Sequence, residues 1–135
     1  MIMEPSEKLK PLIEKVHNYI NDVIIPLDQE FIDETENSGR WQHSPRQKEI
    51  LDQLKQGAKD QGLWNFFLTE GEHGSGLSTV DYAFIAEETG YSALAAEVFN
   101  CSAPDTGNME VLAKYGSQAQ KDRWLEPLLN GEIRS

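Results

Sequence analysis

Apolar residues near the start of the chain recur every three or four positions, which is the period of an α-helix. These residues are Leu9, Leu12, Ile13, Val16, Ile20, Val23 and Ile24. No window of the chain sustains the period-two alternation of a half-buried strand, and the β-branched residues are scattered. We therefore expect an all-α fold, a bundle of five or six helices.

Serine residues predict where several helices begin, because a serine hydroxyl can accept a hydrogen bond from an N–H group of the first helical turn. Three serines are followed, three residues later, by a side chain that can bond back to the serine backbone. These pairs are Ser44 with Gln47, Ser78 with Asp81, and Ser117 with Gln120. Ser6 is the expected N-cap of the first helix, and shorter helical stretches are expected at 94–99 and 106–115.

Glycine and proline predict where the helices end. The chain is expected to leave its helices at Gly62, Gly90, Gly116 and Gly131. Pro26 is expected to kink or end the first helix near Ile25, and Pro127 to make the last turn of the final helix irregular. Between helices, we expect the apolar run 63–68 to be a buried connection and 70–76 to be a glycine-rich loop.

Acidic residues outnumber basic residues by 23 to 12, which gives a formal net charge of -11. This balance argues against nucleic acid and anionic membrane surfaces as partners, since both demand a basic footprint. The acidic stretch 27–35 is expected to be a solvated helix. No apolar run approaches the roughly 20 residues that span a bilayer. The amino end from Met1 to Lys10 lacks the apolar core of a secretory signal, so we expect a cytoplasmic location.

Few groups are candidates for metal binding or nucleophilic chemistry. Glu14 with His17 and Glu70 with His73 match the carboxylate–histidine spacing of di-iron helix bundles. The second pair lies in the glycine-rich loop rather than on a helix, so we expect two surface histidines and no metal site. A single cysteine excludes an internal disulfide. Cys101 is expected to be a small buried residue rather than a nucleophile.

Two further groups of residues either pack in the core or line a binding site. Core packing is the expected role of the aromatic residues Trp64, Phe66, Phe67 and Trp124. Asp105 and Asn108 lie between Phe99 and Met109, and they must be hydrogen-bonded if they are buried. Asp105 either caps the helix that starts at Thr106, which is the favoured interpretation, or joins the polar rim of a pocket. The residues alone therefore show no complete catalytic apparatus.

Several segments resemble the amino-terminal helical domain of the acyl-CoA dehydrogenase family. Residues 81–90, with the sequence DYAFIAEETG, resemble the central helix of that domain. Residues 112–132 resemble another segment of it, through the pattern YG…QK…WL…L…GE. Within the family, 63–68 and 99–110 are most similar to a branch associated with long acyl chains. In animals that branch is fused to a kinase-like domain.

The resemblance implies a function for a longer protein. Enzymes of this family combine the helical domain with a β-domain and a carboxyl-terminal helical bundle, bind FAD, and oxidise the Cα–Cβ bond of an acyl-CoA thioester. Their flavin-contacting segment would follow Ser135, and their catalytic glutamate lies later still, so no catalytic or cofactor-binding residue is assigned. We therefore expect 1–135 to be a single helical domain, truncated before the β-domain and inactive alone.

For this chain the resemblance implies one wall of the acyl pocket, formed by Phe99, Asn100, Ala103 and Thr106. FAD is expected in the full-length parent enzyme and not on this chain. The implied partners are the remaining domains of the parent, its acyl-CoA substrate and further copies in a homo-oligomer. A mitochondrial or peroxisomal parent is the alternative location. The alternative function is a stand-alone helical interaction module without catalysis, which would bury its apolar face by self-association or against a partner.

Overall fold

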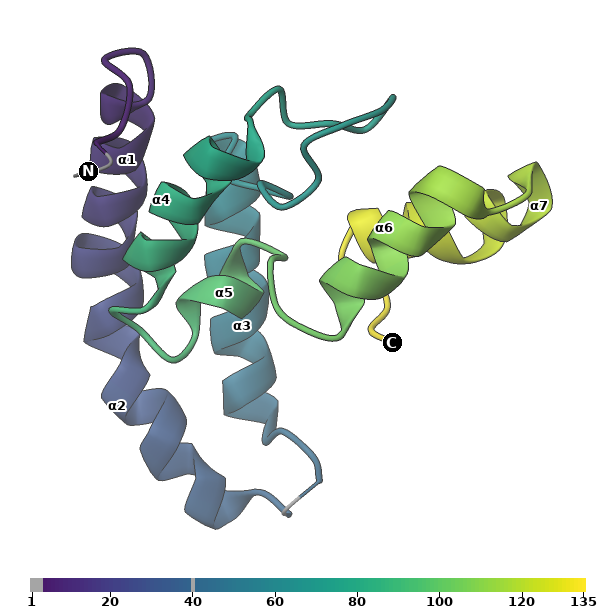
Figure 1. Ribbon diagram of the computed structural model, residues 1–135. Coiled ribbons are helices and arrows are strands. Elements are labelled where there is room, and N and C mark those ends of the chain that lie inside the picture. The colour runs from purple at the N-terminus through teal and green to yellow at the C-terminus, as the bar shows by residue number, and fades with distance from the viewer. Residues whose placement is uncertain (1–3, 40) are drawn as a thin grey trace.

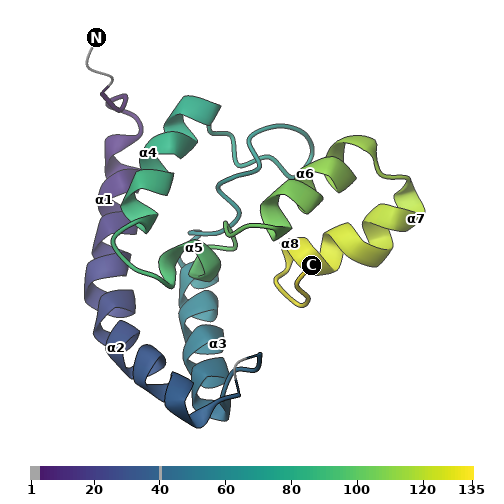
Figure 2. The same ribbon diagram turned by 60° about the horizontal axis from the view of Figure 1, so that its bottom comes forward.

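The computed structural model describes residues 4–39 and 41–135, and the regular elements in this part of the chain are all helical. The expected all-α fold is therefore confirmed. The helices between Lys10 and Val98 form one lobe, and those between Asp105 and Leu129 form a second, as Figures 1 and 2 show.

The first lobe begins with a long bent helix. α1 (Lys10–Tyr19) runs through a π-helical turn (Ile20–Ile24) into α2 (Ile25–Asp33), which is followed by a 3-10 turn (Glu34–Asn37). Pro26 lies in the first turn of α2, so the proline kinks the helix rather than ending it (Figure 2). The side chains of α2 are all half-buried or exposed, as expected for this acidic stretch.

The first helix starts later than the sequence predicts. It begins at Lys10 with Leu9 at the N-cap, so the prediction of Ser6 as the N-cap was wrong. The carbonyl oxygen of Ser6 instead accepts hydrogen bonds from the N–H groups of Leu9 at 2.9 Å and Lys10 at 3.2 Å. The side chain of Leu9 is buried in the core, so tertiary packing draws this turn against the first lobe.

The other helices of the first lobe begin where the sequence predicts. Ser44 caps α3 (Pro45–Asp60) and Ser78 caps α4 (Thr79–Thr89), each through reciprocal hydrogen bonds with the side chain three residues later. The short helix α5 (Ala95–Val98) lies within the expected stretch.

The helices α1, α3, α4 and α5 lie around the core of the first lobe (Figure 1). Apolar side chains from all four meet in this core. Its most deeply buried members, at 0 or 1% exposure, include Val16, Ile20, Ile24, Ile50, Leu54, Ile85, Val98 and Phe99. The hydroxyl of Tyr19 donates to the carbonyl oxygen of Leu54 at 2.7 Å, so this buried polar atom is satisfied. The connection 63–68 joins the core through Leu63 and Phe66, which confirms it as a buried segment.

The second lobe contains α6 (Asp105–Tyr115), α7 (Gln118–Gln120) and α8 (Glu126–Leu129), with a π-helical turn (Lys121–Leu125) before α8. Its core is separate from that of the first lobe and is made of Phe67, Leu68, Met109, Leu125, Leu128 and Leu129. The expected capping box of Ser117 is confirmed. The connection 63–68 therefore supplies side chains to both cores.

The two π-helical turns show how a proline fits within a bent helix. Pro26 and Pro127 each lie two positions after such a turn. The N–H group just before each proline donates five residues back, from Ile25 to Ile20 and from Glu126 to Lys121. Because proline has no N–H group and its ring crowds the preceding turn, the wider turn accommodates the missing hydrogen bond. The irregularity expected at Pro127 therefore lies in the turn before it.

No helix within residues 4–39 and 41–135 is both long and apolar enough to cross a membrane. The cytoplasmic location stays a prediction. It depends on the amino end, of which residues 1–3 lie outside the described residues.

Candidate functional site

The four residues predicted to line a pocket lie on one short segment, 99–106. This segment leads from α5 into α6, where the two lobes meet (Figure 2). Phe99 is 0% exposed and belongs to the core of the first lobe. Asn100 is also buried, whereas Ala103 is exposed and Thr106 is half-buried in the first turn of α6. The side chains of Ala103 and Thr106 are therefore accessible at the surface, whereas those of Phe99 and Asn100 lie beneath it.

Asn100 is the point at which this segment is attached to the second lobe. Its backbone has a φ of 56°, in the left-handed region that few residues other than glycine adopt. Its side-chain Nδ2 donates to Asn65 Oδ1 at 2.7 Å and to the carbonyl oxygen of Leu128 at 3.0 Å. Asn65 Nδ2 in turn donates to the carbonyl oxygen of Leu129 at 3.0 Å. The two asparagines thus join the segment, the connection 63–68 and α8.

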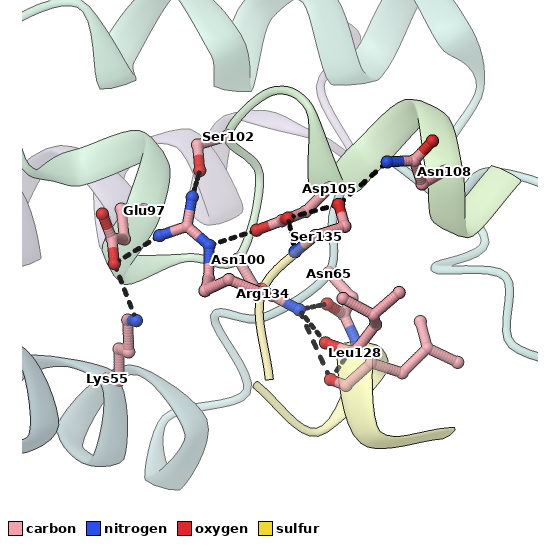
Figure 3. Close-up of polar contacts among 11 residues, drawn as sticks. Lys55, Asn65, Glu97, Asn100, Ser102, Asp105, Asn108, Leu128, Arg134 and Ser135 are labelled. Carbon is pink, nitrogen blue, oxygen red and sulfur yellow. Dashed lines mark hydrogen bonds and ion pairs between the residues drawn. The ribbon is translucent and has the colours of Figure 1, made fainter. Parts of the chain in front are cut away.

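Arg134 is the centre of a charged cluster that contacts the same segment (Figure 3). Its Nη1 lies 2.6 Å from Glu97 Oε1, and its Nη2 donates to Ser102 Oγ at 3.1 Å. Its Nε donates to Asp105. Glu97 also accepts from Lys55 Nζ at 2.9 Å, which connects the cluster to α3. Two acids and two bases therefore neutralise one another at the junction.

Asp105 does not play the capping role that the sequence favours for it. It is the first residue of α6, Pro104 occupies the N-cap, and the prediction that Asp105 caps this helix was wrong. Its carboxylate is 3% exposed and binds Arg134, while its Oδ1 accepts from both the N–H and the Oγ of Ser135 at 2.8 Å. Asn108 Nδ2 donates to the same Ser135 Oγ at 2.8 Å. Asp105 therefore attaches the segment after Gly131 to α6.

The environment of this cluster favours the charged forms of both acids. Burial opposes ionisation of Asp105, but its hydrogen bonds from Ser135 and the charge of Arg134 outweigh burial, so the pKa of Asp105 is lowered. Burial likewise opposes ionisation of Glu97, and its bonds and attraction to Lys55 and Arg134 lower its pKa. Both groups are therefore carboxylates at neutral pH.

Two of the hollows near the junction lie beside α6. One, of about 400 Å³, lies beside Ser135 and is mainly apolar, with Val111, Leu112, Trp124 and Ile133 in its lining. The other, of about 380 Å³, lies between the glycine-rich loop and α6, and its lining includes His73 and the charged residues Glu70, Glu72, Glu110, Lys114 and Lys121. Trp124 is 41% exposed, so its prediction as a core residue was wrong.

The histidines pair with different residues from those that the sequence spacing suggests. His17 Nδ1 lies 2.8 Å from Glu88 Oε2 on α4, and His73 Nε2 lies 3.4 Å from Glu126 Oε1. Among the described residues, no three histidine, cysteine or acidic side chains gather as a metal site.

Cys101 is held as a neutral thiol. Its Sγ donates to the carbonyl oxygen of Phe99 at 3.3 Å. Burial raises the pKa of the thiol to about 11, which disfavours the reactive thiolate at neutral pH. The residue is half-buried rather than fully buried, and its environment agrees with the interpretation that Cys101 is not a nucleophile.

Sequence reasoning missed the roles of Lys55, Glu97 and Arg134. These three residues are far apart in the sequence, at helical and loop positions where a charged side chain is ordinarily solvated. A weak signal was present, since the segment from Glu132 to Ser135 follows the Gly131 helix stop and carries one cation that could pair with an acid. The acid with which it pairs depends on the path of the chain.

Comparisons with known proteins place this geometry in a family. Residues 6–132 match the family model described as "Acyl-CoA dehydrogenase, N-terminal domain". The chain is 44% identical over 135 residues to Acyl-CoA dehydrogenase family member 10 of Mus musculus, covering 96% of this chain and 12% of that protein. It is 49% identical over 133 residues to Acyl-CoA dehydrogenase family member 11 of Homo sapiens, covering 96% and 16%.

A solved structure, "a putative acyl-CoA dehydrogenase from Mycobacterium abscessus", superposes with a TM-score of 0.84 at 44% identity. The match covers 98% of this chain and 34% of that one. The chain therefore spans between 12% and 34% of the length of these three proteins.

Proposed function

The chain belongs to the acyl-CoA dehydrogenase family as its amino-terminal domain, and we propose that it serves this role in an FAD-dependent enzyme that oxidises the Cα–Cβ bond of acyl-CoA thioesters. The observation that carries the proposal is the family match over residues 6–132, together with 44% identity to a solved structure over 98% of the chain. The matches to members 10 and 11 agree with the branch that the sequence resembles.

In this proposal, segment 99–106 forms one wall of the acyl pocket. Ala103 and Thr106 supply its accessible face, since one is exposed and the other half-buried. Phe99 and Asn100 support that face from behind, because both are buried. Such a wall removes the acyl chain from water, which contributes about 0.8 kcal/mol for each buried methylene group.

The described residues do not fit a site for the FAD phosphates. The starts of α3, α4 and α7 present the N–H groups that favour a phosphate, but Ser44, Ser78 and Ser117 already accept hydrogen bonds there. The net charge of -11 adds repulsion. We therefore assign the flavin, which supplies the hydride acceptor when bound, to the rest of the enzyme, and we expect the chain alone to be inactive.

A domain replacement tests the proposal. Residues 6–135 would replace the corresponding segment of the Mycobacterium abscessus protein, and acyl-CoA-dependent reduction of an acceptor dye would be measured for short and long acyl chains. We expect the replaced enzyme to retain turnover, and Ala103→Phe to lower kcat/KM for long chains by tenfold or more. Ala83→Phe, at an exposed position on α4, is the matched control. Turnover by the 135-residue chain alone, or equal effects of both substitutions, would contradict the proposal.

A second candidate, an interaction module without catalysis, is favoured by one observation. Val111, Tyr115, Trp124 and Ile133 are large apolar side chains between 41% and 75% exposed. Three of them line the hollow beside Ser135. Light scattering distinguishes the two functions, since this alternative expects concentration-dependent association that Trp124→Ser abolishes. A monomer at every concentration would count against self-association.

A further inference from the structure

We propose that Arg134 is a positioning residue, which holds segment 99–106 in place by tying α5 to α6 across it. The inference rests on the function proposed above, because 99–106 is the segment expected to meet the acyl chain. In this proposal Arg134 does not itself contact the substrate.

The guanidinium group of Arg134 contacts acceptors before, within and at the end of the segment (Figure 3). Its Nη1 lies 2.6 Å from Glu97 on α5, its Nη2 donates to Ser102, and its Nε donates to Asp105 on α6. A guanidinium group is planar and its N–H groups point in fixed directions, so it sets the relative positions of the acceptors that it binds. An ammonium group is a point charge and does not impose that geometry.

Each acid in the cluster is also attached to a second group, so the cluster joins the two lobes. Lys55 Nζ on α3 binds Glu97 at 2.9 Å, which fixes Glu97 to the first lobe. Ser135 donates twice to Asp105, which lies on α6 in the second lobe. Arg134 lies between these two attachments.

The first part of the segment is held by apolar packing, since Phe99 lies in the first core and Cys101 packs against both cores. The residues that follow leave the cores, because Ser102 is half-buried and both Ala103 and Pro104 are exposed, so apolar packing restrains this part of the path less. Asn100 anchors one side of the segment in a left-handed conformation, with a φ of 56°. A single left-handed residue of this kind persists only where its surroundings hold it. Arg134 supplies a further restraint, at Ser102 and Asp105.

Hydrogen exchange of the 135-residue chain tests the proposal. The variants are Arg134→Lys and Arg134→Met. The lysine keeps the positive charge but loses the planar guanidinium geometry, and the methionine loses both. We expect amides of 99–106 to exchange at least tenfold faster in each variant, while α1 and α3 keep their protection. Arg46→Met is the matched control, because Arg46 also binds two acids, Glu30 and Glu49. Exchange at the wild-type rate in Arg134→Lys would overturn the proposal, since charge alone would then suffice.

A double variant separates positioning from simple neutralisation of a buried charge. Arg134→Met leaves Asp105 without its cation, and adding Asp105→Asn removes that charge. If Arg134 positions the segment, the double variant still exchanges at least tenfold faster over 99–106. Wild-type exchange in the double variant would overturn the proposal. If Arg134→Met fails to fold, Arg134→Lys and the double variant carry the same test.

The replaced enzyme of the preceding section distinguishes this inference from the proposed function. We expect Arg134→Lys to raise KM for long-chain acyl-CoA threefold or more, with a smaller change in kcat. Faster exchange with unchanged KM would overturn the assignment of 99–106 to the acyl wall and support positioning alone. Unchanged exchange in an enzyme that turns over would overturn positioning and leave the proposed function standing.

Discussion

Asn65 and Asn100 are a pair of left-handed residues, with φ values of 57° and 56°, whose side chains bind each other across 35 positions of the sequence. The Nδ2 of Asn100 donates to the Oδ1 of Asn65 at 2.7 Å, and the backbone N–H of Asn65 donates to the carbonyl oxygen of Phe99 at 3.0 Å. Asparagine adopts this conformation more readily than most residues with a Cβ atom. Each asparagine therefore turns the chain and also joins the connection 63–68 to the segment 99–106.

Substitutions of Asn100 separate these two roles. Asn100→Gly loses the side-chain hydrogen bonds but keeps the left-handed backbone, and we expect it to cost about 1–3 kcal/mol of unfolding free energy. Asn100→Ala adds a conformational penalty of about 1–2 kcal/mol to that loss. Urea unfolding of both variants checks the order, and an alanine variant as stable as the glycine variant would contradict it.

Gly131 is restricted both by its backbone and by its neighbour. Its φ is 70°, and a Cβ atom there would lie 2.8 Å from Cζ2 of Trp64. Gly62 has a similar φ of 71° but open space around it, which makes it a matched control. We expect Gly62→Ala to cost about 1–2 kcal/mol and Gly131→Ala more than that, because the clash adds to the backbone penalty. Thermal or urea unfolding measures both, and equal costs would show that the Trp64 ring moves freely.

Two glycines within helices are expected to respond to alanine with opposite signs. Alanine at Gly107 in α6 meets open space, so it is expected to stabilise the fold by about 0.5–1 kcal/mol through helix propensity. A Cβ atom at Gly57 in α3 would lie 2.4 Å from the hydroxyl of Tyr19, which donates to Leu54. Gly57→Ala is therefore expected to destabilise the fold. Denaturation midpoints test the prediction, which fails if both substitutions stabilise.

The buried carboxylates make stability depend on acidic pH. The pKa values of Asp105 and Glu97 are lowered in the folded state, so the unfolded chain binds more protons in this range. The stabilisation is present above the unfolded pKa values, near 4, and is lost as pH falls through the lower folded values. We expect Asp105→Asn to be more destabilising at pH 7 than at pH 3. Urea unfolding at the two pH values checks this, and a pH-independent cost would exclude the mechanism.

Cys101 is expected to react slowly with thiol reagents in the folded chain. With a thiol pKa of about 11, only about one molecule in a thousand carries the thiolate at pH 8. The rate of reaction with a disulfide reagent should rise about tenfold for each pH unit up to that value, provided that the chain stays folded. The chain in denaturant is the control, and it should react at least about 100-fold faster at pH 8. Equal rates would mean that the thiol is accessible.

The helix starts were predictable where they depend on local side chains. Ser44, Ser78 and Ser117 each bind the side chain three residues later, and all three capping boxes are present. The prediction of Ser6 as the N-cap failed because Leu9 packs into the core and shifts the start of α1. Pro26 and Pro127 predicted an irregularity in the helices that contain them. Its form is a π-helical turn just before each proline, and this form depends on how each bent helix fits its lobe.

The features of the site also divide into those that local sequence predicts and those that depend on the fold. The all-helical fold, the main helix boundaries and the family could be predicted from the sequence, because periodicity, caps and motifs are local properties. The partners of the charged residues could not. Asp105 binds Arg134 rather than capping its own helix, and Glu97 is shared between Lys55 and Arg134, through contacts that exist only in the folded chain. A charged side chain has many possible partners along the chain. It pairs with the group that the packing of the two cores brings within about 3 Å of it.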